Sequence, residues 1–192
     1  MDAGLAGDGS ALSLLEVGSL ARGVVVADAV AKRAQVLLLE CGPTSPGKYL
    51  VLFAGGVAEV AESLEAGAAA AGDALLDRLF LAHPHAQLLP ALRAGSRGYP
   101  HDAADDAAGV VELLSVAAAL RAADAACKAA DVRLQLLHLA RGIGGKAWFI
   151  LRGELTSVEA AVLAATEAAG DGLLAGAEIL ARPHLDLRGL AL

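Results

Sequence analysis

The chain has 192 residues, 56% of them hydrophobic and only 3% aromatic, and a formal net charge of −7. This charge argues against a nucleic-acid surface, because phosphate binding needs clustered Lys and Arg. Charged residues interrupt every apolar stretch before it reaches the roughly 18 residues of a membrane span. Residues 1–10 carry two aspartates and no basic residue, which fits neither a signal peptide nor a transit peptide. We therefore expect a cytoplasmic protein that binds neither nucleic acid nor membrane.

The first half of the chain predicts the order strand, helix, strand, loop, strand, helix, strand, and the second half predicts the same order again. Ala and Leu favour helices intrinsically, and short apolar runs between turn residues indicate strands. The helices are expected at 20–33, 57–71, 116–130 and 155–169. The clearest strands are expected at 36–39, 49–53, 134–137 and 148–151. Four strands and two helices in each half predict an α/β fold with helices on a mostly antiparallel sheet.

The two halves also share residues. Glu16 recurs as Glu112, an offset of 96 residues (112 − 16). Self-similarity at a fixed period is the signature of repeated structural units. Three further features keep this order, and the offset grows to 98 and 99 where loops accept insertions. They are Asp28 and Lys32, which recur as Asp124 and Lys128; Gly47-Lys48, which recurs as Gly145-Lys146; and His83-Pro84-His85, which recurs as Arg182-Pro183-His184.

The repeat predicts two domains, 11–93 and 107–192, joined by a linker at 94–106. The linker is rich in Gly, Pro and Asp, a composition typical of connecting segments. Residues 86–93 are expected to form a short helix that ends the first copy and leads into the linker.

A glycine-rich loop in each copy resembles a phosphate-binding loop only in part. Residues 42–48 satisfy the G-x-x-x-x-G-K core, but Tyr49 stands where a Mg²⁺-binding hydroxyl is required. Pro43 and Pro46 each remove an N–H donor that a phosphate would need. The second loop departs twice, with Ala140 and Ala147 at the corresponding positions. We interpret both loops as strand-to-strand turns whose glycines supply positive φ.

The candidate chemical groups do not assemble into a catalytic pattern. The four carboxylates Glu16, Asp28, Glu112 and Asp124 occupy repeat-matched positions, which favours a structural role for them. The two cysteines, Cys41 and Cys127, have neither metal-ligand spacing nor a CxxC partner. The five histidines are scattered along the chain and predict no metal site; they are His83, His85, His101, His138 and His184. We therefore do not expect an enzyme, a metal or a cofactor.

These features together resemble the bacterial microcompartment (BMC) domain family. The matching elements are an apolar opening strand that ends in Glu, D-A-x-x-K at the end of the first helix, a glycine-rich loop, and a closing P-H, and both copies carry them. The resemblance implies two tandem, unpermuted, ferredoxin-like α/β BMC domains. It is similar to the trimeric subtype found in propanediol-utilisation compartments. In that subtype a homotrimer of tandem domains mimics a hexamer, with a central pore.

The resemblance also implies which residues form contacts between tiles in a shell. Lys32 and Lys128 correspond to the edge lysines, and Arg182 corresponds to the arginine of the closing motif. His83 stands where the first copy would be expected to carry Arg, so three of the six edges are expected to bind neighbours differently. The implied partners are other shell proteins, hexamers and pentamers, which meet the tile edge to edge.

At the pore, the subtype carries a cysteine directly before P-G-K that lets three subunits hold a 4Fe–4S cluster. This chain carries Ser45 there, and a serine hydroxyl is a poor cluster ligand. Cys41 lies four residues upstream and would substitute only in a remodelled loop. We therefore expect an open pore without a cluster, with Lys48 and Arg141 near enough to favour anions. The expected lining residues are Thr44, Ser45, Pro46 and Gly47 from the first copy and Ile143, Gly144 and Gly145 from the second.

Three functions follow as hypotheses. The first is a structural shell tile whose pore passes small polar metabolites. The second is an electron-conducting tile with a pore-bound 4Fe–4S cluster, which Ser45 disfavours and Cys41 keeps open. The third is a small-molecule-binding regulatory or enzymatic domain built on the same α/β unit. Mean hydropathy of +0.57 favours an assembly, because two thin domains leave more apolar surface than a monomer usually exposes.

Overall fold

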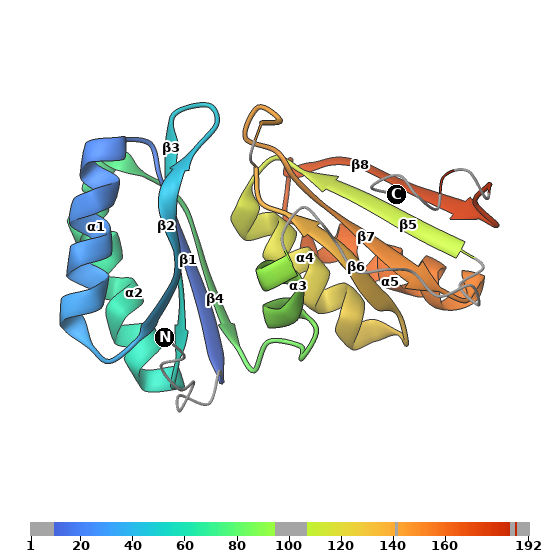
Figure 1. Ribbon diagram of the computed structural model, residues 1–192, viewed down its shortest axis with the longest axis horizontal. Helices are drawn as coiled ribbons and strands as arrows, with labels where there is room; N and C mark the ends of the chain where they lie inside the picture. Colours follow the sequence, from blue (N-terminus) through green and yellow to red (C-terminus); the bar gives the residue numbers. More distant parts are fainter. Residues whose placement is uncertain (1–9, 95–106, 141, 185–186, 188–192) are drawn as a thin grey trace. The chain divides into compact units, whose positions relative to one another are not determined.

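The computed structural model describes residues 10–94, 107–140, 142–184 and 187. The chain divides into two compact units, Met1–Pro84 and His85–Leu192. Figure 1 shows that each unit consists of one sheet with two long helices against one of its faces. No helix among the described residues is both long enough and apolar enough to cross a membrane.

Unit 1 is an antiparallel sheet with the strand order β2-β3-β1-β4. Two helices connect its strands, and a short 3₁₀ turn follows the second helix. In chain order its elements are β1 (Ala11–Val17), α1 (Leu20–Arg33), β2 (Leu37–Thr44), β3 (Lys48–Gly55), α2 (Val57–Ala71), η1 (Gly72–Ala74) and β4 (Leu75–Ala82).

Unit 2 repeats this topology with the strand order β6-β7-β5-β8, again antiparallel. Its elements are α3 (Leu88–Ala94), β5 (Ala107–Leu113), α4 (Val116–Ala129), β6 (Arg133–His138), β7 (Ala147–Gly153), α5 (Leu155–Ala168) and β8 (Leu174–Ala181). The predicted fold class of two α/β units, each with a four-stranded antiparallel sheet, is therefore confirmed.

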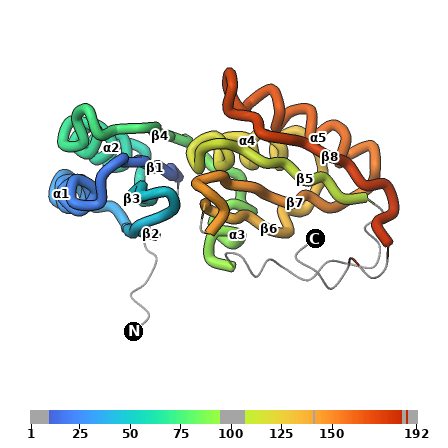
Figure 2. The backbone as a smooth tube through the Cα atoms, turned by 90° about the horizontal axis from the view of Figure 1, so that it is seen from above, coloured from blue at the N-terminus to red at the C-terminus, as the bar shows by residue number. Residues whose placement is uncertain are grey.

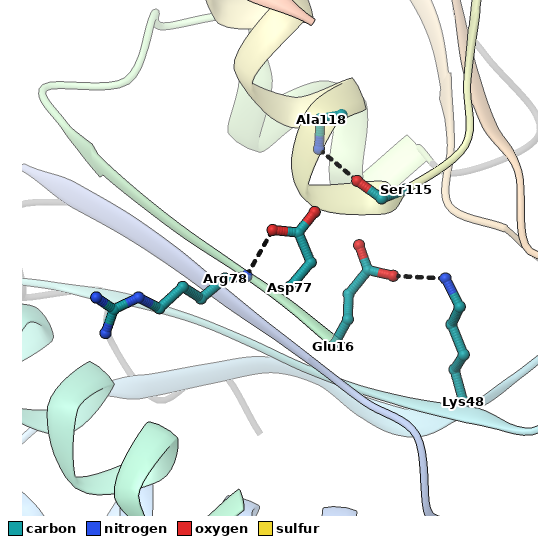
Figure 3. Close-up of polar contacts among 6 residues, drawn as sticks. All are labelled: Glu16, Lys48, Asp77, Arg78, Ser115 and Ala118. Atoms are coloured by element: carbon teal, nitrogen blue, oxygen red, sulfur yellow. Dashed lines mark hydrogen bonds and ion pairs between the residues drawn. The ribbon is translucent and has the colours of Figure 1, made fainter. Parts of the chain in front are cut away.

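The first helix of each unit begins at a serine cap that the repeat preserves. Ser19 Oγ accepts a hydrogen bond from the Arg22 N–H, and Ser115 Oγ accepts one from the Ala118 N–H. The second cap is drawn in Figure 3. Such caps satisfy one of the backbone donors that a helix start leaves open. The caps explain why these two helices begin at the residues predicted from the sequence.

In each unit one glycine lets a helix pack closely on the sheet. This glycine lies on the helix in unit 1 and on a strand in unit 2. In unit 1 the glycine is on the helix: a Cβ at Gly67 would lie 2.5 Å from Leu15 Cδ1 on β1. In unit 2 it is on the strand: a Cβ at Gly109 of β5 would lie 2.6 Å from Val162 Cγ2 on α5. Real side chains do not tolerate such contacts, so both layers depend on the missing Cβ.

Two local predictions need correction. The second strand was expected to end at residue 39, but β2 continues to Thr44. It accommodates Pro43 because β2 is an edge strand, with one side that makes no ladder hydrogen bonds and tolerates a residue without an N–H. The short helix expected at 86–93 as the end of the first copy is α3, and it packs with unit 2, beside β6 (Figure 2).

Candidate functional site

The turn between β2 and β3 contains most of the residues expected to line a pore. It is short, consisting of Ser45, Pro46 and Gly47 only, and the Gly47 N–H closes it by donating to the Thr44 carbonyl at 3.0 Å. Thr44 itself is the last residue of β2 and is buried. Pro46 and Gly47 are exposed, and Ser45 is half-buried. The accessible part of this turn is thus smaller than the sequence indicated.

The equivalent turn between β6 and β7 is longer and richer in glycine. The Lys146 N–H donates to the Ile143 carbonyl at 3.4 Å. Gly144 and Gly145 both have positive φ, 69° and 86°, a conformation that favours glycine. Ile143 and Gly144 are exposed, whereas Gly145 is buried. Arg141, expected near this turn, lies outside the described residues.

The lysine that follows each turn is held by a carboxylate on the neighbouring strand. Lys48 Nζ lies 3.1 Å from Glu16 Oε2 of β1, and Figure 3 shows the two side chains pointing toward each other. Lys146 Nζ lies 3.1 Å from Glu112 Oε1 of β5. The Lys48 charge is therefore compensated, which weakens the expectation that it favours anions at the turn. All four repeat-matched carboxylates are in ion pairs with lysines.

Cys41 does not reach the turn that would have to present it to a cluster. Because β2 continues to Thr44, Cys41 lies inside the strand, opposite Val51 of β3. Burial, and to a lesser degree the neighbouring Glu40 carboxylate, raise the pKa of its thiol. A protonated thiol is a poor metal ligand. The residues of this region therefore do not fit an iron–sulfur cluster.

The lysines expected at tile edges lie at the ends of matching helices. Lys32 of α1 pairs with Asp28 at 2.7 Å, and Lys128 of α4 pairs with Asp124 at 2.6 Å. Asp124 also accepts a hydrogen bond from the backbone N–H of His85 at 2.7 Å. The structure thus joins the D-A-x-x-K element of the second copy to the P-H motif that ends the first copy.

His83 and Arg182, the two unequal residues of the closing motifs, have the same backbone conformation. Their φ angles are 53° and 52°, and both residues are exposed. The His83 N–H donates to the Ser10 carbonyl at 2.6 Å. The two positions thus share an exposed location and a backbone conformation, and their place at tile edges stays a prediction.

The sequence did not single out a large difference between the first helices of the two units. Leu20 and Val24 of α1 align with Val116 and Leu120 of α4 at the repeat offset. Val116 and Leu120 are fully buried, whereas Leu20 and Val24 are 47% and 59% exposed. Val25 beside them is exposed as well. Leu20, Val24 and Val25 therefore form an open apolar surface on α1, which we call the α1 face.

No group of three or more His, Cys, Asp or Glu side chains among residues 10–94, 107–140, 142–184 and 187 is arranged to hold a metal ion. The described chain thus presents turns, paired charges and an apolar face.

Comparison with known proteins identifies the repeated unit. The family model of the BMC domain matches the chain twice, at residues 11–84 and 107–183. The bacterial microcompartment shell protein PduT of Citrobacter freundii is 41% identical over 175 residues, which cover 91% of this chain and 93% of that protein. The carboxysome shell protein CsoS1A of Hydrogenovibrio crunogenus is 44% identical over 84 residues, 42% of this chain and 84% of its own length.

A solved structure agrees with this identification. The crystal structure of a microcompartment protein from Desulfitobacterium hafniense DCB superposes with a TM-score of 0.83 at 40% identity, covering 93% of this chain and 97% of that one. The match therefore extends over both units and their order in the chain. The chain belongs to the BMC domain family, and it is a bacterial microcompartment shell protein with two BMC domains in tandem.

Proposed function

We propose that three copies of the chain form a closed ring of six BMC domains, a pseudohexameric tile of the microcompartment shell with a central pore. The tile has a structural and transport role and is not an enzyme. It sits in the shell edge to edge with other shell proteins, hexamers and pentamers. The number three follows from the family resemblance, since two domains per chain then make six.

The difference between the α1 face and α4 carries this proposal. The repeat gives the two helices equivalent surfaces, yet the chain buries Val116 and Leu120 and leaves Leu20 and Val24 open. In the single chain one of the two repeat-equivalent surfaces is therefore buried and the other is open. A second copy that covers the α1 face leaves its own α1 face open, and such a head-to-tail contact is satisfied completely only when the ring closes.

The turns between β2 and β3 and between β6 and β7 supply the pore in this proposal. Their accessible residues are the half-buried Ser45 and the exposed Pro46, Gly47, Ile143 and Gly144, while Thr44 and Gly145 are buried. The lysine of each turn is paired with a carboxylate. A lining of one hydroxyl, backbone groups and the apolar side chains of Pro46 and Ile143, without unpaired charge among its described residues, suits small polar metabolites.

Lys32, Lys128, His83 and Arg182 form the tile edges in this proposal. The exposure of Lys32 and the matched, exposed positions of His83 and Arg182 support it. The His83 side chain is shorter than the Arg182 side chain and has fewer hydrogen-bond donors. The edges formed by the first copy therefore differ from those formed by the second. This difference suits a tile that meets other kinds of shell protein.

The test places a charge on the α1 face and measures the mass of the protein in solution. Val24→Glu is compared with Leu163→Glu, an exposed apolar residue of α5 whose repeat counterpart is already a glutamate, Glu65. Val24 is exposed in the single chain, so the substitution is expected to leave folding unchanged. Sedimentation velocity is expected to give a trimer for the control and smaller species for Val24→Glu.

A trimer that survives Val24→Glu with an unchanged dissociation constant would contradict the proposed covering of the α1 face. Circular dichroism and thermal unfolding of both variants separate a loss of assembly from a loss of folding. The control shows whether an added glutamate on any exposed helix position is enough to disperse the ring.

A further inference from the structure

The solvent-facing side of α5 carries an exposed leucine between two glutamates. Leu163 is 60% exposed, the largest exposed fraction of any large apolar side chain among the described residues. Glu159 and Glu167 lie four residues before and after it, and both are exposed. Residues spaced by four lie on the same side of a helix. The three side chains therefore form one surface, which we call the α5 face.

The two carboxylates of the α5 face are not compensated within the described part of the chain. Glu159 and Glu167 make no ion pair and no side-chain hydrogen bond with any residue in the described ranges. The opposite side of α5 packs on the sheet of unit 2 and buries Val158, Ala161 and Val162. The α5 face thus combines open apolar area with uncompensated negative charge.

The equivalent surface of the first domain, on α2, has balanced charges instead. Glu62 Oε2 lies 3.0 Å from Arg33 Nη2. Glu65 Oε1 lies 3.1 Å from Arg78 Nη1. At the repeat offset of these helices, Leu163 stands in the position of Glu65. The apolar centre of the α5 face therefore corresponds to one member of an ion pair in the first domain.

Both arginine positions of the first domain are alanines in the second. Ala129 occupies the position equivalent to Arg33, and Ala177 occupies the strand position equivalent to Arg78. A single exposed leucine is common on protein surfaces. Leu163 differs from that common case because it lies between two uncompensated carboxylates, where the first domain balances its charges. The two domains thus present different chemistry to a partner.

We propose that the α5 face binds an amphipathic helix of a partner protein, in which an apolar residue has a lysine or arginine four residues away on each side. The apolar residue covers Leu163, and the two basic residues pair with Glu159 and Glu167. Four residues rise about 6 Å along either helix, so the opposite charges meet where the apolar side chains touch. An amphipathic helix on a complementary apolar surface is a recurring mode of recognition.

Charge complementarity selects this partner. Two carboxylates repel nucleic acid and anionic lipid, whereas they attract a basic protein segment. The α5 face lies within one domain, so the inference goes beyond the proposed ring and does not depend on it.

The test measures the binding of a fluorescent model peptide to the full chain by fluorescence anisotropy. The peptide is an alanine-based helix with lysine, leucine and lysine at successive four-residue spacing, and the control peptide carries glutamate in place of both lysines. We expect the lysine peptide to bind and the glutamate peptide not to bind. Leu163→Glu adds a negative charge but removes the apolar contact, so it is expected to weaken binding of the lysine peptide about tenfold or more.

Two matched double variants separate the α5 face from the overall charge of the chain. Glu159→Gln with Glu167→Gln is expected to weaken binding of the lysine peptide about threefold or more, since each contributes an exposed ion pair. Glu62→Gln with Glu65→Gln on α2 removes the same charge and is expected to leave the affinity unchanged. Circular dichroism of each variant shows whether folding is retained.

Three results would overturn the α5 face as a docking surface. The first is a lysine peptide that does not bind the unmodified chain. The second is tighter binding to Leu163→Glu, which would show that charge alone attracts the peptide. The third is an equal loss of affinity in the two double variants. Sedimentation of the same samples tests the ring separately, because a monomeric unmodified chain would contradict the ring and leave the peptide result standing.

Discussion

The two BMC domains repeat the same ion pair in two different environments. In the first, Glu16 is fully buried and Lys48 only 20% exposed; in the second, Glu112 and Lys146 are 39% and 43% exposed, and both pairs measure 3.1 Å. The geometry is preserved although the surroundings are not. Removing one partner costs much more folding free energy in a buried ion pair than in an exposed pair of the same length. Repeat-matched residues therefore need not contribute equally to stability.

The largest change in the free energy of unfolding is expected when the lysine of this pair is replaced, and the two domains allow the same replacement to be compared. Lys48→Met leaves the buried Glu16 carboxylate without its lysine and is expected to lower the free energy of unfolding by about 3 kcal/mol or more. Lys146→Met acts on an exposed pair and is expected to cost less than about 1 kcal/mol. Urea denaturation of both variants measures the difference, and equal losses would contradict the role assigned to burial.

The next effect concerns the close approach of helix and sheet. Gly67→Ala in α2 places a Cβ about as close to Val30 Cγ2 as to Leu15, at 2.6 Å, and overpacking of this kind costs about 1–3 kcal/mol. The equivalent residue of α5 is Ala165, where the spacing is provided by Gly109 instead. Thermal unfolding is expected to show a lower midpoint for Gly67→Ala, and a raised midpoint would contradict the packing argument.

Replacing Ser63 is expected to change the free energy of unfolding by a smaller amount and to increase it. Its Oγ is buried and has no hydrogen-bond partner among the described residues, and the equivalent residue in the second domain is Ala161. Since a buried unsatisfied hydroxyl costs about 1 kcal/mol or more, Ser63→Ala is expected to stabilise the chain by about that amount. Destabilisation in the same urea assay would indicate that the hydroxyl has a partner.

The smallest effect at neutral pH concerns the two thiols. Burial, followed by the nearby Asp124 carboxylate, raises the pKa of Cys127 from 9.0 to about 12, and this residue is buried. Cys41 is exposed on the edge strand β2, although partial burial of its thiol raises its pKa as well. Iodoacetamide at pH 8 is expected to modify Cys41 first, as peptide mass spectrometry would show.

The raised pKa of Cys127 also predicts a pH dependence. Stability that depends on the neutral thiol is fully present below about pH 9 and is lost as the pH rises toward 12, because the unfolded chain releases its proton first. Cys127→Ala lacks this contribution, so its unfolding free energy is expected to fall less than that of the unmodified chain between these pH values. If both proteins lost the same unfolding free energy over this pH range, the neutral Cys127 thiol would make no such contribution to stability.

Much of the fold was predictable because both copies carry strong local signals. The four long helices lie within one residue of their predicted limits, since Ser19 and Ser115 cap two of them and Ala-rich sequence continues through all four. The full length of β2 was not predictable, because Gly42 and Pro43 are unusual in strands and only an edge position tolerates them.

The candidate site was predictable only in part. The sequence placed the turns and the matched lysines, but not that Glu16 and Glu112 hold two of those lysines, because a strand-to-strand contact depends on register. The open α1 face was not predictable either. Leu20 and Val24 are as apolar as Val116 and Leu120, and what decides their burial lies outside the helix. The same holds for α3, which follows one domain in sequence and packs with the other.

In the proposed ring, the open α1 face of each chain is covered by another chain, and three chains close the ring. Native mass spectrometry of the unmodified chain is the measurement that decides whether this ring forms. The expected result is a single dominant species at three times 19.2 kDa, with no stable dimer, because a dimer would leave one α1 face open. A monomer across the micromolar range, or an open series of larger oligomers, would contradict the ring.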